Sequence, residues 1–232
     1  MVLPYKITPD KIKDSIVILT VKYEVEYEEI IGSLITQLRK SKKYNFITSS
    51  PKNDNTDKKN FLFFNEFIKF QINKGTININ CNRNYIGWKK YRDEIKYIID
   101  SISKLDFDIN VTSLGLRYIS EFKETNLDDN LTFSFSFGQE SIKSKQYSFS
   151  SQFVLNGHNV ILTLRNEIPT VEKDDIIKYS HIDIDISNDD LNINFNEVND
   201  LLVSLDKVHN EEKQVFFNLL KSEYLEKLNP KY

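Results

Sequence analysis

Alternating strand patterns separated by turn residues constrain the fold of this chain more than any other feature. Segments 146–155 and 159–167 are joined by Asn156-Gly157, a pair typical of a two-residue β-hairpin turn. Further strands are expected at Phe107–Phe122, Leu131–Phe137 and Ser180–Ser187. Because consecutive strands joined by short connections form antiparallel sheets, the sequence predicts a mostly antiparallel sheet.

Each half of the chain opens with a strand and closes with a long helix. The first strand spans Ile16–Val25, and apolar residues at helical spacing predict helices at 27–40, 84–105 and 195–228, the last with a break near His209–Asn210. The predicted fold is therefore α+β, with antiparallel strands covered by three long helices. These elements form either two similar strand-to-helix lobes, 1–106 and 107–232, or one folding unit.

Charge is distributed unevenly between the two halves. Residues 1–123 carry 21 Lys and Arg against 15 Asp and Glu, whereas residues 124–232 carry 10 against 19. The N-terminal lobe is therefore basic and the C-terminal lobe acidic. Lobes of opposite charge either pack together or attract different partners.

The single cysteine and the short apolar runs indicate a cytoplasmic protein. Cys81 has no second cysteine with which to form an intramolecular disulfide or a cysteine-based zinc cluster, which fits a reducing compartment. The N-terminus has no apolar segment typical of a signal peptide. No apolar run approaches the ~20 residues that a membrane-spanning helix needs, so we expect no membrane partner.

Common catalytic and nucleotide-binding motifs are absent from the sequence. Six glycines, scattered singly, form neither a dinucleotide-binding fingerprint nor a phosphate-binding loop. There is no nucleophile elbow of the G-x-S-x-G type. The sequence favours a non-enzymatic protein without a cofactor, and leaves an enzyme with a divalent metal open.

His181, Asp183 and Asp185 are the candidate metal ligands. They alternate with isoleucines, so in a strand the three polar side chains point to one side. An imidazole and two carboxylates can bind a divalent metal or act as general acid and base, which would suit a hydrolase. The simpler interpretation is a half-exposed strand with its isoleucines in the core.

Two clusters of basic residues are candidate nucleic-acid contacts in the first half. Lys42 and Lys43 follow the first predicted helix, and Lys89, Lys90 and Arg92 lie at the start of the second. Basic side chains interleaved with aromatic residues can hold phosphates and stack bases. Cations near the end of a helix also stabilise its dipole, which is the structural alternative for the first cluster.

Three short stretches resemble a known family. They are Tyr85-Ile86-Gly87-Trp88, Gly115-Leu116-Arg117-Tyr118-Ile119-Ser120, and the closing helix with Leu205-Asp206-Lys207-Val208-His209 and Val215-Phe216-Phe217. Together they are similar to a sporadically distributed family of uncharacterised prokaryotic proteins marked by an R-Y-I-N strand motif, with Ser120 in place of the usual Asn. The resemblance implies no activity, but a patchy distribution implies an accessory role such as phage defence or a mobile element.

Arg117, Tyr118 and Trp88 are the remaining candidate binding residues. Arg117 and Tyr118 are neighbours on a strand and so face opposite sides, and an arginine among apolar neighbours needs a carboxylate or an anionic ligand. Three hypotheses result. The first is a non-enzymatic binding or assembly protein with a protein partner or a second copy of itself. The second is a nucleic-acid- or nucleotide-binding protein using the basic half, and the third is a metal-dependent hydrolase at His181.

Overall fold

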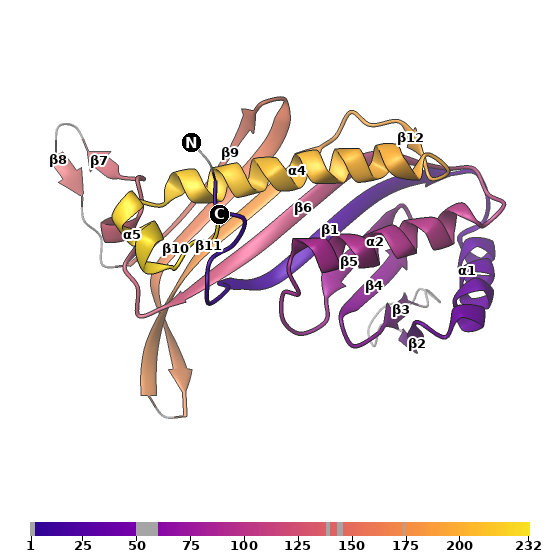
Figure 1. The fold of residues 1–232 in the computed structure, drawn as a ribbon, viewed down its shortest axis with the longest axis horizontal. Coiled ribbons are helices and arrows are strands. Elements are labelled where there is room, and N and C mark those ends of the chain that lie inside the picture. The colour runs from indigo at the N-terminus through magenta and orange to yellow at the C-terminus, as the bar shows by residue number, and fades with distance from the viewer. Residues whose placement is uncertain (1–2, 50–59, 138–139, 143–145, 174) are drawn as a thin grey trace. The chain divides into compact units, whose positions relative to one another are not determined.

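The computed structural model describes residues 3–49, 60–137, 140–142, 146–173 and 175–232 (Figure 1). The chain separates into two compact units. We call them the hairpin unit, composed of Met1–Lys13, Arg117–Ile186 and His209–Tyr232, and the meander unit, composed of Asp14–Leu116 and Ser187–Val208. The predicted lobes follow the order of the chain, whereas each of these units is assembled from separate segments.

Helices and strands both contribute to the fold. The helices are α1 (Tyr27–Ser41), α2 (Trp88–Ser103), α3 (Leu127–Asn130), α4 (Val198–Leu219) and α5 (Ser222–Lys227). The strands are β1 (Ile12–Tyr23), β2 (Asn45–Ser49), β3 (Asn60–Phe64), β4 (Ile68–Asn73), β5 (Thr76–Cys81), β6 (Ile109–Lys123), β7 (Phe135–Phe137), β8 (Glu140–Ile142), β9 (Tyr147–Leu155), β10 (His158–Glu172), β11 (Asp175–Asn188) and β12 (Ile193–Asn194).

The strands form a large antiparallel sheet, which confirms the predicted α+β class. In the described part of the chain the sheet has ten strands in the order β2-β3-β4-β5-β1-β6-β11-β10-β9, with β12 beside β6. The strands β7 and β8 form a separate pair. The strands β1, β6 and β11 and the helix α4 each contribute residues to both units.

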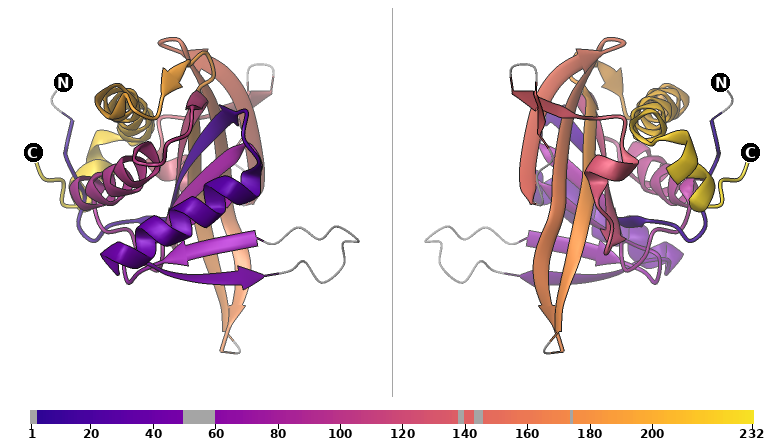
Figure 2. Two further views of the ribbon diagram at one scale, coloured as in Figure 1. Left: turned by 90° about the vertical axis from the view of Figure 1, so that its right-hand side faces the viewer. Right: turned by 90° about the vertical axis from the view of Figure 1, so that its left-hand side faces the viewer.

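The meander unit contains the consecutive antiparallel strands β2 to β5. The aromatic segment Phe61–Phe70, expected to form one or two strands, forms two, β3 and β4, because Asn65 turns the chain between them. The Oδ1 atom of Asn65 accepts hydrogen bonds from the backbone N–H groups of Phe67 and Ile68, both at 2.8 Å. Along β4 and β5 alternate residues are buried, and the helices α1 and α2 lie on one side of these strands (Figure 2).

The hairpin unit contains the predicted Asn156-Gly157 turn, which the structure confirms. Leu155 pairs with His158 across the turn, and the two turn residues have φ angles of 50° and 83°. Positive φ at both positions is the requirement of a type I′ turn, which asparagine and glycine meet with little strain. The turn therefore sets the register of β9 against β10.

The closing helix differs from the prediction. Instead of one helix over 195–228 broken near His209, α4 continues through His209 and the chain leaves the helix at Leu220 and Lys221. Leu220 forms a bridge with Leu131, and the N–H of Lys221 donates to the carbonyl of Asn130 at 3.0 Å. These pairings with a distant segment end the helix, and neither can be seen in the local sequence.

The carboxyl group of Glu212 on α4 predicts a pH dependence of stability. Glu212 is 5% exposed, and burial raises its pKa from 4.5 to about 8. The folded chain therefore keeps this proton at pH values where the unfolded chain has lost it. Its contribution to the free energy of unfolding is complete below pH 4.5 and falls between pH 4.5 and 8, by up to about 1.4 kcal/mol per pH unit.

Glu212→Gln should remove this slope, so thermal denaturation should show a larger gain in melting temperature at pH 8 than at pH 5. Glu226→Gln, the same change at an exposed position on α5, serves as the control. An unchanged pH dependence in Glu212→Gln would contradict the assignment.

Candidate functional site

Two of the predicted site residues, Arg117 and Asp183, form an ion pair in the hairpin unit. They lie on the neighbouring strands β6 and β11. The Nε and Nη2 atoms of Arg117 donate to the two carboxylate oxygens of Asp183 at 2.8 and 2.6 Å. The side chain of Arg117 is 38% exposed and that of Asp183 is 11% exposed. This two-point geometry is the strongest form of an arginine–carboxylate contact, and it supplies the partner that Arg117 needs.

A second charged contact lies on the same two strands. His181 Nε2 is 3.2 Å from Glu121 Oε2, and the Nζ atom of Lys13 donates to Glu121 Oε1 at 3.1 Å. We call Lys13, Arg117, Glu121, His181 and Asp183 the sheet-face cluster. All five belong to the hairpin unit.

The isoleucines of β11 are buried as predicted, although Asp183 between them is also buried, at 8% exposure. Ile182, Ile184 and Ile186 are 1%, 1% and 0% exposed, so the polar residues between them point to the opposite face. Both carboxylate oxygens of Asp183 already accept bonds from Arg117, and His181 contacts Glu121. Within the described residues, no group of three or more His, Cys, Asp and Glu has an arrangement that could hold a metal ion.

Tyr118 faces the interior of the hairpin unit, on the side opposite to Arg117. It is 2% exposed, and its hydroxyl lies 3.4 Å from Nδ1 of His209 on α4. The two rings meet edge to face, with 6.0 Å between their centroids. The tyrosine of the R-Y-I-S stretch therefore packs against the helix α4 inside the hairpin unit.

Lys43, a predicted nucleic-acid contact, lies against a buried carboxylate in the meander unit. Its Nζ atom is 3.0 Å from Oε1 of Glu94, and the hydroxyl of Tyr44 donates to Oε2 of Glu94 at 2.6 Å. Burial and the hydrogen bond to this carboxylate raise the pKa of Tyr44. The Nζ atom of Lys43 also lies 3.9 Å from the ring centroid of Tyr97.

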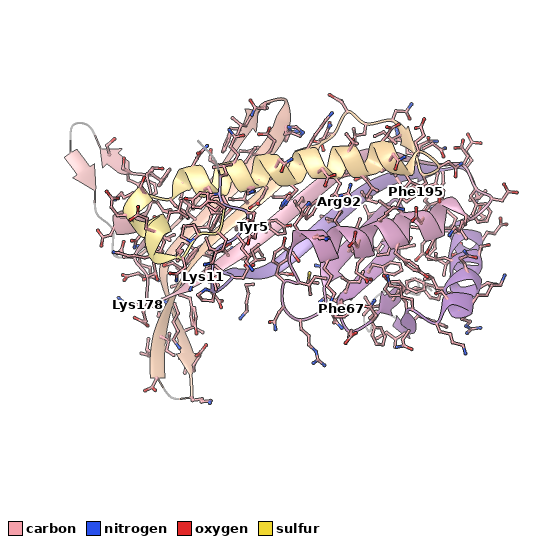
Figure 3. All side chains as sticks on the ribbon, viewed as in Figure 1. Tyr5, Lys11, Phe67, Arg92, Lys178 and Phe195 are labelled. Carbon is pink, nitrogen blue, oxygen red and sulfur yellow. The ribbon has the colours of Figure 1, made fainter. Side chains whose placement is uncertain are left out.

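Lys90 and Arg92 on α2 also make contacts within the meander unit. The Nζ atom of Lys90 lies 3.3 Å from the ring centroid of Phe67, and Arg92 donates to both carboxylate oxygens of Asp206 at 2.7 and 2.8 Å. Figure 3 labels Phe67 and Arg92 among all the side chains. Trp88 begins the same helix and packs edge to face on the buried Tyr91. Lys42, Lys89 and Lys90 are exposed, so three of the five predicted basic residues lie on the surface, whereas Lys43 and Arg92 pair with carboxylates of the same unit.

Exposed apolar residues gather on β9, β10 and β11. Among the large hydrophobic side chains of the described residues, nine are exposed, and five of them lie on these neighbouring strands. The five are Phe153, Val154, Ile161, Val171 and Ile176. By contrast, Phe63 on β3 and Phe70 on β4 are each 1% exposed.

The outer part of the β10–β11 hairpin projects from its unit (Figure 1). Val171 and Ile176 near its end are 73% and 74% exposed, and Pro169, Thr170, Glu172 and Asp175 are also exposed. The strands predicted at 159–167 and 180–187 both end before this extension. The run Ile168-Pro169-Thr170-Val171 was the available signal, but its proline argued against a strand.

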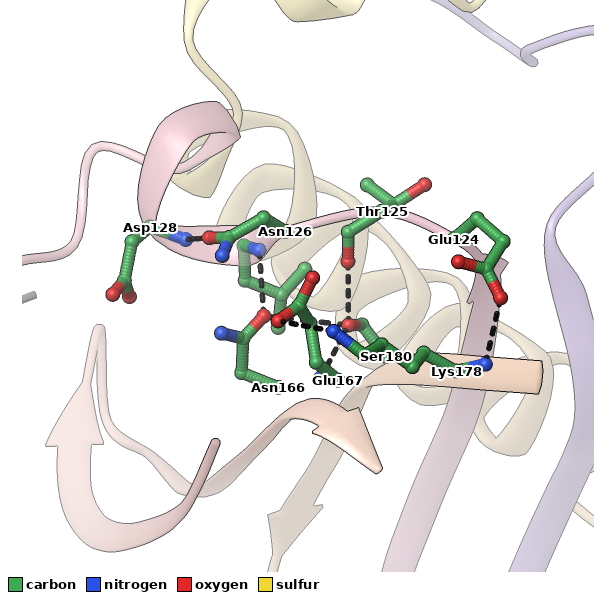
Figure 4. A network of polar contacts seen from close by, with 9 residues as sticks. Glu124, Thr125, Asn126, Asp128, Asn166, Glu167, Lys178 and Ser180 are labelled. Carbon is green, nitrogen blue, oxygen red and sulfur yellow. Dashed lines mark hydrogen bonds and ion pairs between the residues drawn. The ribbon is translucent and has the colours of Figure 1, made fainter. Parts of the chain in front are cut away.

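A buried polar network holds the base of this hairpin (Figure 4). Ser180 on β11 donates to the carbonyl of Thr125 at 2.6 Å and accepts from the N–H of Glu167 at 2.9 Å. Asn166 on β10 accepts from the N–H of Leu127 at 2.7 Å. Because Ser180 and Asn166 are both 0% exposed, the network fixes the point from which the two strands extend.

Comparison with known proteins adds no relative. No family model matches the chain, and no similar sequence among curated proteins and no similar solved structure is found. Within the described residues, no helix is long and apolar enough to cross a membrane. The resemblance to the family with the R-Y-I-N motif stays a prediction.

Asp183→Asn should lower the free energy of unfolding by about 1–3 kcal/mol, because it leaves Arg117 facing a neutral partner. Urea denaturation measures the change, and Asp190→Asn at an exposed position is the matched control. For each of the two variants, Asp183→Asn and Asp190→Asn, the melting temperature should be the same with and without a chelator. A melting temperature of the unsubstituted chain that falls when EDTA is added would instead favour a metal at His181, Asp183 and Asp185.

Proposed function

We propose that this chain is a non-enzymatic binding protein that holds a protein partner through the end of its β10–β11 hairpin. The observation that carries the proposal is the exposure of Val171 and Ile176, at 73% and 74%, on a projecting pair of strands. In keeping with the family resemblance, we place the protein in an accessory system of phage defence or a mobile element.

The chemistry of the hairpin end suits a protein surface. Fully burying an exposed valine or isoleucine side chain contributes about 1.5–3 kcal/mol. Glu172, Lys173 and Lys178 lie close to Val171 and Ile176 along the two strands, which gives a small apolar centre with charged neighbours. Protein interfaces are commonly organised in this way, with an apolar core and a polar rim.

The buried network at the base supports the same proposal. A binding segment loses less conformational entropy on association when it is already ordered, and Ser180 and Asn166 anchor both strands of the hairpin. We also infer, as the sequence predicts, that the three long helices α1, α2 and α4 cover strands of the antiparallel sheet.

The other two functions have less support. Lys43, Lys90 and Arg92 are engaged by Glu94, Phe67 and Asp206, so phosphate binding by these side chains would have to replace existing contacts. Asp183 would likewise have to leave Arg117 before it could bind a metal. Val171 and Ile176, by contrast, have exposed apolar side chains, so binding through them would not have to replace an ion pair.

The double variant Val171→Ser with Ile176→Ser tests the proposal. The tagged full chain is isolated from its own host, the co-purified protein is identified, and its affinity for the purified chain is measured by calorimetry. We expect the double variant to lose at least about tenfold in affinity, which corresponds to about 1.4 kcal/mol.

The control is the double variant Ile47→Ser with Val203→Ser, which makes the same type of change away from the hairpin. These two residues are also exposed, at 52% and 51%. Equal affinities of the unsubstituted chain and the hairpin variant would contradict the proposal. Co-purified nucleic acid whose binding weakens steeply with salt would favour the second hypothesis.

A further inference from the structure

In the described part of the chain, the strand β9 is an edge of the sheet. It spans nine residues, ends the strand order, and pairs in the described part of the chain with β10 alone. At the opposite end of the order, β2 has only five residues. A long edge strand presents a row of unpaired backbone groups that can pair with another strand.

The register of β9 identifies these groups. Leu155 and His158 flank the two-residue turn, so they form a hydrogen-bonded pair, and every second residue of β9 likewise bonds β10. The N–H and C=O groups of the residues between them point away from β10. These outward residues are Ser148, Ser150, Gln152 and Val154.

The sequence of β9 has none of the features that protect natural edges. Tyr-Ser-Phe-Ser-Ser-Gln-Phe-Val-Leu contains no charged residue and no proline. Natural proteins usually block an edge with lysine, proline, a bulge or a very short strand. The strand next to it, β10, carries the charged residues Arg165, Glu167 and Glu172.

We propose that β9 pairs antiparallel with β9 of a second copy of this chain, which forms a two-fold symmetric dimer. The register that pairs all nine residues has its axis at Ser151. In that register Ser150 lies opposite Gln152 of the second copy, and Ser148 lies opposite Val154. The four outward residues are distributed symmetrically about Ser151, so each meets another outward residue and the hydrogen bonds can form.

The side chains also favour a second copy over a charged partner strand. Phe149 and Phe153 lie on the same face as the buried Leu164 and Val160, their partners on β10. Phe153 is 37% exposed, whereas Phe149 already packs on Phe133 with 4.9 Å between ring centroids. The symmetric register places Phe153 opposite Phe149 of the second copy, which would cover the exposed ring with an aromatic cluster.

This surface is separate from the end of the β10–β11 hairpin, so either proposal can fail while the other stands. Sedimentation of the purified full chain should show a dimer at micromolar concentration. Gln152→Pro should give a monomer, because the N–H that it removes points outward and the pairing with β10 is kept. Gln152→Ala is the control and should remain dimeric.

A cysteine at the symmetry axis tests the register. Ser151→Cys places two thiols opposite each other, at a spacing that a disulfide can bridge, so mild oxidation should give a covalent dimer. Ser148→Cys should not, because it faces Val154 of the second copy. Cys81 is 6% exposed and is common to both variants.

A chain that stays monomeric at all concentrations would overturn the proposal, as would a dimer that Gln152→Pro leaves intact. Equal cross-linking of Ser148→Cys and Ser151→Cys would overturn the symmetric register. If the chain is monomeric but a host protein slows amide exchange in β9, a foreign strand occupies the edge and the self-pairing is wrong. The hairpin variant of the preceding subsection distinguishes loss of partner binding from loss of the dimer.

Discussion

Side chains along a β-strand alternate between the two faces of the sheet, and this alternation decides on which face the sheet-face cluster lies. On β6, Tyr118, Ser120 and Phe122 are buried, and Arg117 and Glu121, which alternate with them along the strand, take the other face. The strand β11 follows the same rule, with Ile182 and Ile184 inside and Asp183 between them. Because β6 and β11 are neighbours, the rule brings Arg117 to Asp183 and makes the sheet-face cluster a consequence of burying the opposite face.

Local features of the fold could be predicted from the sequence because their causes are local. The Asn156-Gly157 turn requires positive φ at two positions, and the alternation around His181 requires only that isoleucines be buried. The end of α4 could not be predicted, since it depends on the pairing of Leu220 with Leu131, nearly ninety positions earlier in the chain. The extension of β10 and β11 was missed because it is an exposed ribbon, where no burial pattern marks a strand.

The candidate site residues show the same division between features with a local cause and features that depend on a distant segment. From the sequence, Arg117 was expected to need an anionic partner, whereas Asp183 was a candidate metal ligand. The two residues therefore belonged to different hypotheses. Their pairing across 66 positions depends on strand order, which the local pattern does not contain. The same holds for Arg92, whose partner Asp206 comes from another helix. Arg117, Asp183, Lys43 and Arg92, chosen as ligand contacts, thus form ion pairs within the fold, whereas Lys42, Lys89 and Lys90 are exposed.

Exposed backbone edges impose a further condition on a sheet of this size, because a sheet that can pair at both ends can also grow into a fibre. Here the two ends differ. Neither edge strand carries a charged residue, but β2 is short, with five residues, whereas β9 has nine. Antiparallel pairing of β9 with itself would use the long edge of both copies and leave only the short edge β2 at each end of the joined sheet. A two-fold dimer is thus the smallest assembly in which this sheet has no long edge left to pair.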